Sequence, residues 1–378
     1  MNADKKPPAP SPDPYLQREI ALAPTFLGTT HKVQVYSYGP NDGAPRIYIQ
    51  AGLHAGEHPG ILVANQLKKR LSSLAEEGAL LGRVDLVPVA NPIGLGQILN
   101  GEINGRFDFV HRRNFNRQFP DVSAAVLKSV AKAKNGLAAL EAVRHSAATA
   151  INAWPTSDHI DSLKRTLFRI AIEADITLDL HCDGESSVHV YTGGVNIEWC
   201  RLFANRIGAE VIATGNSDDG LAFDDALNKF WADVAGLIAN PPSSLKQPEA
   251  MTVELRGRAD VSPTHARNDA DAIINALMAL NVIKAADELG QSSVTTNPPP
   301  VEIAAKDIEV IHAKSPGILS YRVDLGQRCK PGQIIAELVD PYSSAKEGEL
   351  IRCTRGGMLF SRHISKLAFP GMEVCKLA

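Results

Sequence analysis

The sequence lacks the features of disulfide-stabilised, membrane-spanning and nucleic-acid-binding proteins. Its 378 residues include only five cysteines, an odd number with no C-x-x-C spacing, which argues against a disulfide framework and favours a reducing compartment. No uninterrupted apolar run has the length of a transmembrane helix, and the first 14 residues contain no apolar segment typical of a signal peptide. The net charge of −3 gives no reason to expect nucleic acid or an anionic membrane as a partner. We therefore expect a cytoplasmic protein.

The motifs of two common enzyme classes are also missing. The chain has no G-x-S-x-G, no P-loop and no G-x-G-x-x-G, so neither a serine hydrolase nor a nucleotide-binding protein is supported. The hydrophobic content of 44% and the charged content of 21% are ordinary for a globular protein. The length is sufficient for a large core and for two domains.

Composition divides the chain into four segments. Residues 1–14 are polar and rich in proline, which is typical of a disordered tail. Residues 15–290 combine strand and helix patterns and are expected to form the main domain. Residues 291–300 (QSSVTTNPPP) have the composition of a linker. Residues 301–378 contain short β-like runs in an imperfect internal repeat, similar to the barrel-sandwich of biotinyl and lipoyl carrier domains but without their attachment lysine.

Hydrophobic periodicity predicts an α/β fold, with a mixed central sheet flanked by helices and followed by the small all-β domain. Strands are expected at residues 33–38 (an edge strand), 46–50, 83–89, 176–180, 188–192, 211–213 and 251–255. Helices are expected at residues 59–74, 124–150, 157–173, 199–207, 222–235 and 269–289, and loops at residues 91–94 and 100–120. The second loop is long, and long ordered loops in compact domains are usually functional.

Three side chains that can bind a metal follow two of these strands. His54 and Glu57 form an H-x-x-E pair, framed by glycines, after the strand at 46–50, and His181 directly follows the strand at 176–180. Ligands in open α/β sheets bind beyond the C-terminal ends of strands, and a catalytic zinc usually takes three protein ligands and a water. The pattern predicts one zinc ion per chain. The alternative is that these are ordinary polar loop residues.

Four motifs, GLHAGEHPG, NFNRQFPD, LDLH and TVEL, occur in that order between residues 46 and 260. In this order they resemble the succinylglutamate desuccinylase/aspartoacylase family of zinc carboxypeptidase-like hydrolases. The resemblance implies a carboxypeptidase-like fold and a His, Glu, His ligand set, which carboxypeptidase A also has. It further implies that metal-activated water hydrolyses the amide bond of a small N-acyl amino acid or a related carboxylate-bearing amide.

Glu254, in the TVEL motif, is the predicted general base. Amide hydrolysis requires a group that takes a proton from water and returns it to the leaving amine, and an unpaired carboxylate at a strand end is costly without such a purpose. The alternative is an ion pair with Arg256 or Arg258. Glu185 is the reserve candidate because it lies shortly after His181.

Arg117 and Asn116 fit the recognition of a substrate carboxylate. The guanidinium group matches a carboxylate in bidentate geometry, and the asparagine amide adds a further donor. The alternative is a structural ion pair between Arg117 and Asp121.

The resemblance assigns Arg106 to stabilisation of the oxyanion, where a positive charge favours the transition state. The interval from Arg106 to Asn116 is longer than in aspartoacylases, so Arg112 and Arg113 compete for this role. The strand that precedes His181 also carries Asp179, which points to the same side and is expected to orient a ligand.

Several further residues near the motifs have no assigned role. Asp183, His189 and Tyr191 are candidates for the pocket wall, and Cys182 is expected to be a buried residue rather than a nucleophile. The expected partner is a small acylated amino acid, and a homo-oligomer is compatible with the sequence. The alternatives are a metallocarboxypeptidase acting on short peptides and a non-catalytic zinc-binding protein of the same fold. A C-terminal domain that caps the pocket would admit only small substrates.

Overall fold

The computed structural model describes residues 15–40, 45–130, 134–194, 197–215, 221–239, 247–284, 298–344 and 348–378. The predicted tail at residues 1–14, and residues 291–297 of the predicted linker, lie outside the described residues.

One nine-stranded mixed sheet forms the centre of the molecule, as predicted, in the order β1-β2-β4-β3-β8-β13-β10-β11-β14. Its strands are β1 (Leu16–Ala21), β2 (Lys32–Tyr38), β3 (Arg46–Ala51), β4 (Arg83–Val87), β8 (Ile176–Asp183), β10 (His189–Thr192), β11 (Val211–Thr214), β13 (Glu249–Gly257) and β14 (Val301–Ala304). The pairs β4–β3, β3–β8, β8–β13, β10–β11 and β11–β14 are parallel, and the other three pairs are antiparallel.

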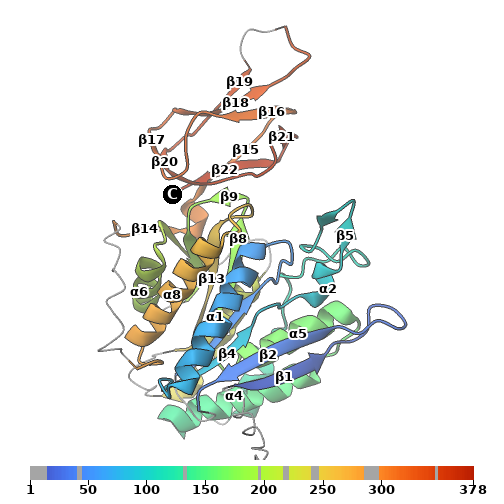
Figure 1. The fold of residues 1–378 in the computed structure, drawn as a ribbon, viewed down its shortest axis with the longest axis vertical. Coiled ribbons are helices and arrows are strands. Elements are labelled where there is room, and N and C mark those ends of the chain that lie inside the picture. Colours follow the sequence, from blue (N-terminus) through green and yellow to red (C-terminus); the bar gives the residue numbers. More distant parts are fainter. Residues whose placement is uncertain are drawn as a thin grey trace, which may run out of the picture.

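Helices cover both faces of this sheet (Figure 1). The helices on one face are α1 (His58–Glu76), α6 (Ile197–Ile207) and α8 (Pro263–Ala279). Those on the other are α3 (Ser123–Ser129), α4 (Gly136–Ala153), α5 (His159–Ala171) and α7 (Phe223–Val234). Short elements complete the domain: α2 (Pro92–Leu95), β5 (Ile98–Leu99), β6 (Glu102–Ile103), β7 (Lys134–Asn135), β9 (Glu185–Ser186), the 3-10 turn Ala235–Leu237 and β12 (Ile238–Ala239).

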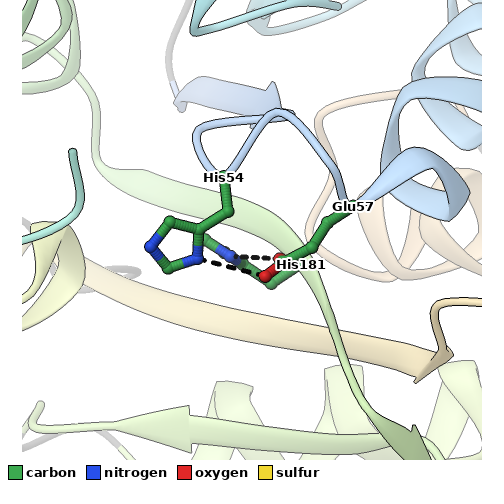
Figure 2. Close-up of side chains that lie close together, drawn as sticks. All are labelled: His54, Glu57 and His181. Carbon is green, nitrogen blue, oxygen red and sulfur yellow. Dashed lines mark hydrogen bonds and ion pairs between the residues drawn. The ribbon is translucent and has the colours of Figure 1, made fainter. Parts of the chain in front are cut away.

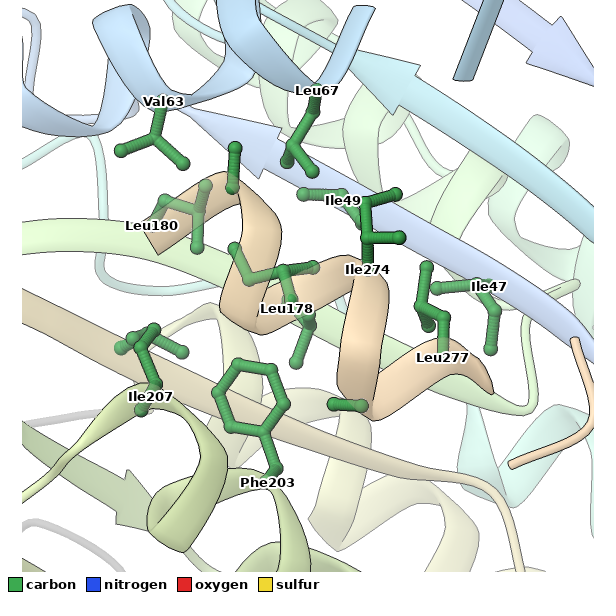
Figure 3. Packing of buried hydrophobic residues seen from close by; sticks show 14 of the residues in the cluster. Ile47, Ile49, Val63, Leu67, Leu178, Leu180, Phe203, Ile207, Ile274 and Leu277 are labelled. Carbon is green, nitrogen blue, oxygen red and sulfur yellow. The ribbon is translucent and has the colours of Figure 1, made fainter. Parts of the chain in front are cut away.

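The central strands are buried on both faces because successive side chains of a strand point to opposite sides. Ile47 and Ile49 of β3 pack with Leu178 and Leu180 of β8 against the first group of helices (Figure 3). Tyr48, between the two isoleucines, packs into the core beneath the second group. Burial on both faces explains the nearly continuous apolar runs of these strands.

The structure differs from the predictions at the outer strands. The strand predicted at residues 33–38 is not an edge strand, because β1 (Leu16–Ala21) pairs with β2 along its full length. The residues of β1 are mostly exposed, so the segment carries no apolar pattern by which it could be recognised. β8 runs through His181 to Asp183, so the histidine lies within the strand rather than after it.

Three predicted helix and loop boundaries are also wrong. The helix predicted at residues 124–150 is two helices, α3 and α4. The predicted loop at 91–94 contains α2, capped by Asn91, whose side chain accepts the backbone N–H of Gly94 at 2.8 Å. The helix predicted at 269–289 begins at Pro263 and ends at Ala279, because Ser262 caps its first turn and proline suits the first helical position.

The C-terminal strands form two small antiparallel sheets around a separate hydrophobic cluster. They are β15 (Glu309–His312), β16 (Gly317–Tyr321), β17 (Arg328–Cys329), β18 (Ile334–Val339), β19 (Glu349–Arg352), β20 (Gly357–Arg362), β21 (Leu367–Ala368) and β22 (Glu373–Leu377), and a 3-10 turn at Ala305–Asp307 precedes them. In Figure 1 they lie next to β9, which pairs with β20. Residues 301–304, which were assigned to this segment, instead form β14 at the edge of the large sheet. Among the described residues, no helix has the length and apolar character required to cross a membrane.

Gly60 allows helix α1 to approach β8 closely. A Cβ at this position would lie 2.7 Å from the carbonyl oxygen of Leu180, the residue before His181. We expect Gly60→Ala to destabilise the protein by about 1–3 kcal/mol, the usual cost of overpacking, although alanine is the better helix former. Urea unfolding monitored by circular dichroism would measure this change. Gly236→Ala is the control, because a Cβ there meets no atom within 4 Å; equal unfolding midpoints for the two variants would contradict the close approach.

Candidate active site

Three neighbouring parallel strands end at the same edge of the sheet and position the site. In the ladder of β3 and β8, Ala51 pairs with Leu180, and in the ladder of β8 and β13, His181 pairs with Glu254. The loop that follows β3 therefore begins beside His181. Side chains from distant parts of the sequence meet here because parallel strands align their C-terminal ends.

His54, Glu57 and His181 come together at this edge, as the sequence predicted for its three metal-binding candidates (Figure 2). Oε1 of Glu57 lies 3.1 Å from Nδ1 of His54, and Oε2 lies 2.8 Å from Nδ1 of His181. All three side chains are buried. One atom from each residue lies within 4.8 Å of the others, so the three residues can hold a single ion between them.

The other nitrogen of each imidazole faces an oxygen. Nε2 of His54 is 3.0 Å from Oδ1 of Asn114, and Nε2 of His181 is 2.9 Å from Oδ2 of Asp179. For His54, Oδ1 of Asn114 can accept a hydrogen from Nε2, whereas His181 and Asp179 are in ion-pair contact. In a neutral ring that carries its hydrogen on Nε2, the lone pair of Nδ1 is directed at Glu57. Such partners fix the tautomer of a metal-binding histidine and raise its basicity. Asp179 was predicted to point to the same side as His181, and it contacts this imidazole; its role in orienting a ligand stays a prediction.

Mutual electrostatics keep Glu57 ionised despite its burial. Burial raises the pKa of this carboxyl group, but His54 and His181 outweigh that effect and lower the pKa well below its usual range. Burial lowers the pKa of His54. Burial acts in the same direction on His181, but Asp179 and Glu57 outweigh it and raise the pKa of this imidazole well above its usual value.

A cavity of about 440 Å³ opens onto these residues and is also lined by Glu254, Arg106, Asn116 and Arg117. Burial, followed by the charges of Glu57 and Asp183, raises the pKa of Glu254 to about 8. Its Oε2 atom is buried and has no hydrogen-bond partner among the described residues. The alternative partner Arg256 instead pairs with Asp269. A larger cavity of about 670 Å³ lies elsewhere, and none of these residues lines it.

The three competing arginines occupy different surroundings. A terminal nitrogen of Arg106 is 3.3 Å from Oε1 of Glu57 and 3.3 Å from Nδ1 of His54. Arg113 forms ion pairs with Asp158 and Asp161 at the start of α5. Arg112 lines a neighbouring cavity rather than this one. Of the three, only Arg106 lines the cavity that Glu254 lines.

Arg117 and Asn116 both line the cavity. Oδ1 of Asn116 accepts the backbone N–H of Phe223 at 2.8 Å, which fixes the amide at the start of α7. A terminal nitrogen of Arg117 donates to the carbonyl of Asn116 at 2.7 Å. Asp121, the alternative partner of Arg117, forms an ion pair with Lys229 at 3.1 Å. Its Oδ1 accepts the backbone N–H of Ser123 at 3.0 Å.

The remaining candidates separate into those that reach the cavity and those that do not. Tyr191, Cys182 and Asp183 line it. Burial raises the pKa of the Cys182 thiol well above its usual value, which disfavours a thiolate nucleophile. His189 is fully buried, and burial lowers its pKa to about 4. Glu185, the reserve base, is instead bound by Lys366 at 2.6 Å and by Arg362 at 3.0 Å.

The sequence analysis missed several residues of the cavity wall. Asp224 and Asp225 at the start of α7, Lys306, and Lys376 of β22 line the cavity, and Asn114 contacts His54. Asn114 lies inside the NFNRQFPD motif and could have been considered there. The others carry no local signal, because only the tertiary fold brings them to the strand ends.

The family model described as the succinylglutamate desuccinylase/aspartoacylase catalytic domain matches residues 43–280. None of the curated proteins matches the chain. Among solved structures, a family protein from Shewanella amazonensis SB2B is 25% identical, with a TM-score of 0.75, over 96% of this chain and 98% of that one. A succinylglutamate desuccinylase/aspartoacylase from Shewanella frigidimarina NCIMB 400 is 24% identical, with a TM-score of 0.79, over 97% of both chains.

A more distant match in fold is the product-bound structure of the ectoine utilization protein EutE from Ruegeria pomeroyi. It is 16% identical, with a TM-score of 0.66, over 96% of this chain and 94% of that one. The family model covers more than half of the sequence, and the four motifs lie in the same region. The chain therefore belongs to the succinylglutamate desuccinylase/aspartoacylase family of hydrolases.

Proposed function

We propose that the protein is a zinc-dependent hydrolase that cleaves the amide bond of a small N-acyl amino acid or a related carboxylate-bearing amide. The observation that carries this proposal is the convergence of two imidazole Nδ1 atoms on the carboxylate of Glu57, in a cavity that Glu254 and Arg117 also line. Membership of a hydrolase family agrees with it.

His54, Glu57 and His181 would hold the zinc ion. Two neutral imidazoles and one carboxylate are a usual ligand set for a catalytic zinc, which keeps a further position open. Each Nδ1 is available because Asn114 and Asp179 face the opposite ring nitrogens. When bound, zinc supplies a Lewis acid that activates water and polarises a carbonyl group.

Glu254 has the surroundings of a general base. Its pKa of about 8, raised by burial and by neighbouring carboxylates, lets it exchange a proton near neutral pH. It would take a proton from water and return it to the leaving amine. Arg106, beside Glu57, would stabilise negative charge that develops on the former carbonyl oxygen.

Arg117 and Asn116 support a substrate that carries a carboxylate, since a guanidinium group and an amide together match its oxygens. The cavity of about 440 Å³ suits a small molecule. We propose that the C-terminal strands restrict its entrance, because Val310 and Lys376 lie on its wall. This restriction favours a small acylated amino acid over the short peptides of a carboxypeptidase. Cytoplasmic location and homo-oligomer formation stay predictions.

The direct test is hydrolysis of N-acetyl, N-formyl and N-succinyl amino acids by the zinc-loaded protein, with short peptides as the competing class. Turnover of at least one acylated amino acid, and little turnover of peptides, is expected. Cleavage of peptides alone would favour the carboxypeptidase function, and inactivity toward both classes would contradict the proposal.

The metal site predicts that protein dialysed against metal-free buffer retains about one zinc ion per chain, as expected for three ligands. His181→Ala should lose most of this metal, because one of three ligands is removed. Elemental analysis by mass spectrometry would measure it, and His145→Ala, on the exposed face of α4, is the control. Full metal retention by His181→Ala would remove this histidine from the site.

The general-base role predicts that Glu254→Gln lowers kcat by about 10²–10⁴-fold while leaving metal content and folding unchanged. The matched control is Glu185→Gln, because Glu185 is held by Lys366 and Arg362 outside the cavity. Steady-state kinetics on the best substrate of the panel would separate the two. A normal kcat for Glu254→Gln would contradict its role as the base.

The carboxylate contact predicts that Arg117→Lys raises KM roughly tenfold with little change in kcat. Lysine keeps the charge but loses the bidentate fork, and the contact exists equally in the ground state and the transition state. In a parallel assay, a substrate whose carboxylate is replaced by an amide should be hydrolysed alike by wild type and variant. If Arg117→Lys impairs hydrolysis of the amide substrate as much as hydrolysis of the acid, Arg117 has a structural or catalytic role instead.

A further inference from the structure

A second cluster of metal-competent side chains lies outside the proposed active site. It consists of Asp108 and His111, in the long loop between β6 and α3, and His159, the first residue of α5. Oδ2 of Asp108 is 3.1 Å from Nδ1 of His111, and Oδ1 is 2.8 Å from Nε2 of His159. One atom from each residue lies within 4.8 Å of the others.

This arrangement is similar to that of the proposed zinc site. There, the two oxygens of Glu57 lie 3.1 Å and 2.8 Å from the nitrogens of His54 and His181. In both clusters one carboxylate lies between two imidazoles, and each oxygen faces one ring nitrogen. In both clusters the carboxylate also accepts a backbone N–H, that of His111 at 2.6 Å for Asp108 and that of Cys182 at 3.2 Å for Glu57. The clusters differ in that Glu57 faces Nδ1 of both histidines, whereas Asp108 faces Nδ1 of His111 and Nε2 of His159.

We propose that Asp108, His111 and His159 form a second binding site for a divalent transition metal ion. Two imidazoles and a carboxylate are ligands that suit Zn²⁺, Co²⁺ and Ni²⁺ better than Ca²⁺ or Mg²⁺. Asp108 and His159 are buried, whereas the side chain of His111 is 39% exposed. The exposed ligand provides an entry path and allows faster exchange than at the fully buried site.

The position of the cluster gives the ion a structural role. Two of its ligands belong to the loop that carries Arg106 and Arg117, and the third begins α5. Arg113 of the same loop is bound to Asp158 and Asp161 at the start of α5. Nζ of Lys164 in α5 donates to the carbonyl of Arg117 at 2.5 Å, so the cluster lies where the loop already contacts the helix. A bound ion would join loop and helix through three coordination bonds and so hold the two cavity arginines in place. This inference does not depend on the proposed hydrolysis.

The experiment measures Zn²⁺ binding by untagged protein that has been stripped with a chelator. His181→Ala removes the first site, so in this variant calorimetric titration should still give about one equivalent, as expected for one three-ligand site. The double variant His111→Ala/His181→Ala should bind almost none. His145→Ala/His181→Ala is the matched control, because His145 is an exposed histidine outside both clusters, and it should retain the equivalent.

Trypsin provides a second readout that requires no activity. The loop contains Arg106, Arg112, Arg113 and Arg117 as cleavage sites, and Zn²⁺ should slow cleavage there severalfold in His181→Ala but not in the double variant. Circular dichroism verifies that the variants are folded. The variant His159→Gln/His181→Ala repeats the test with the ligand that α5 supplies, in place of His111. Absence of Zn²⁺ binding by folded His181→Ala, or binding that survives in His181→Ala when either His111 or His159 is also replaced, would overturn the proposal and leave a hydrogen-bonded cluster only.

Discussion

The parallel pairing of β3, β8 and β13 is the constraint on which the rest of the structure depends. Along β8, Leu178 and Leu180 point into the hydrophobic core beneath α1, α6 and α8, whereas Asp179 and His181 point to the other face. A shift of register by one residue would exchange these faces. It would turn the two leucines toward the polar side chains of the site and bury the two polar side chains among apolar helices. The hydrophobic core thus helps to fix the position of His181 beside Glu254.

Two buried carboxylates at this edge, those of Glu57 and Glu254, differ in how far their surroundings compensate a negative charge. Removing an ion from water is costly unless opposite charges and hydrogen bonds compensate it. Glu57 is compensated by two imidazoles and by the backbone N–H of Cys182 at 3.2 Å. Opposite charges and hydrogen bonds compensate the charge of Glu254 less completely, and burial therefore raises its pKa. One acid is held ionised and the other has a pKa near neutrality, which is the division of roles that the proposed hydrolysis requires.

The sequence predicted the parts of this protein that are determined locally. Apolar strands and the H-x-x-E turn are local, so the boundaries of β3 and the positions of His54 and Glu57 followed from them. β1 was missed because its side chains are mostly exposed, and its place beside β2 depends on backbone pairing. Asp224 was missed because an acidic residue at a helix start is common without function, and only the tertiary fold brings it to the cavity.

The cavity is lined by residues of the large sheet and of the C-terminal strands, so its shape cannot be predicted from a single segment of the sequence. Asp183, at the end of β8, accepts hydrogen bonds from Ser361 at 2.8 Å and from Lys376 at 2.9 Å, and β9 continues into the small sheet through β20. Burial of Asp183 raises its pKa, but Lys376 and His189 outweigh this effect and lower the pKa. An ionised, half-buried aspartate without these partners would be destabilising. The strand that carries His181 therefore depends on contacts with the C-terminal strands, whose residues Val310 and Lys376 also line the cavity.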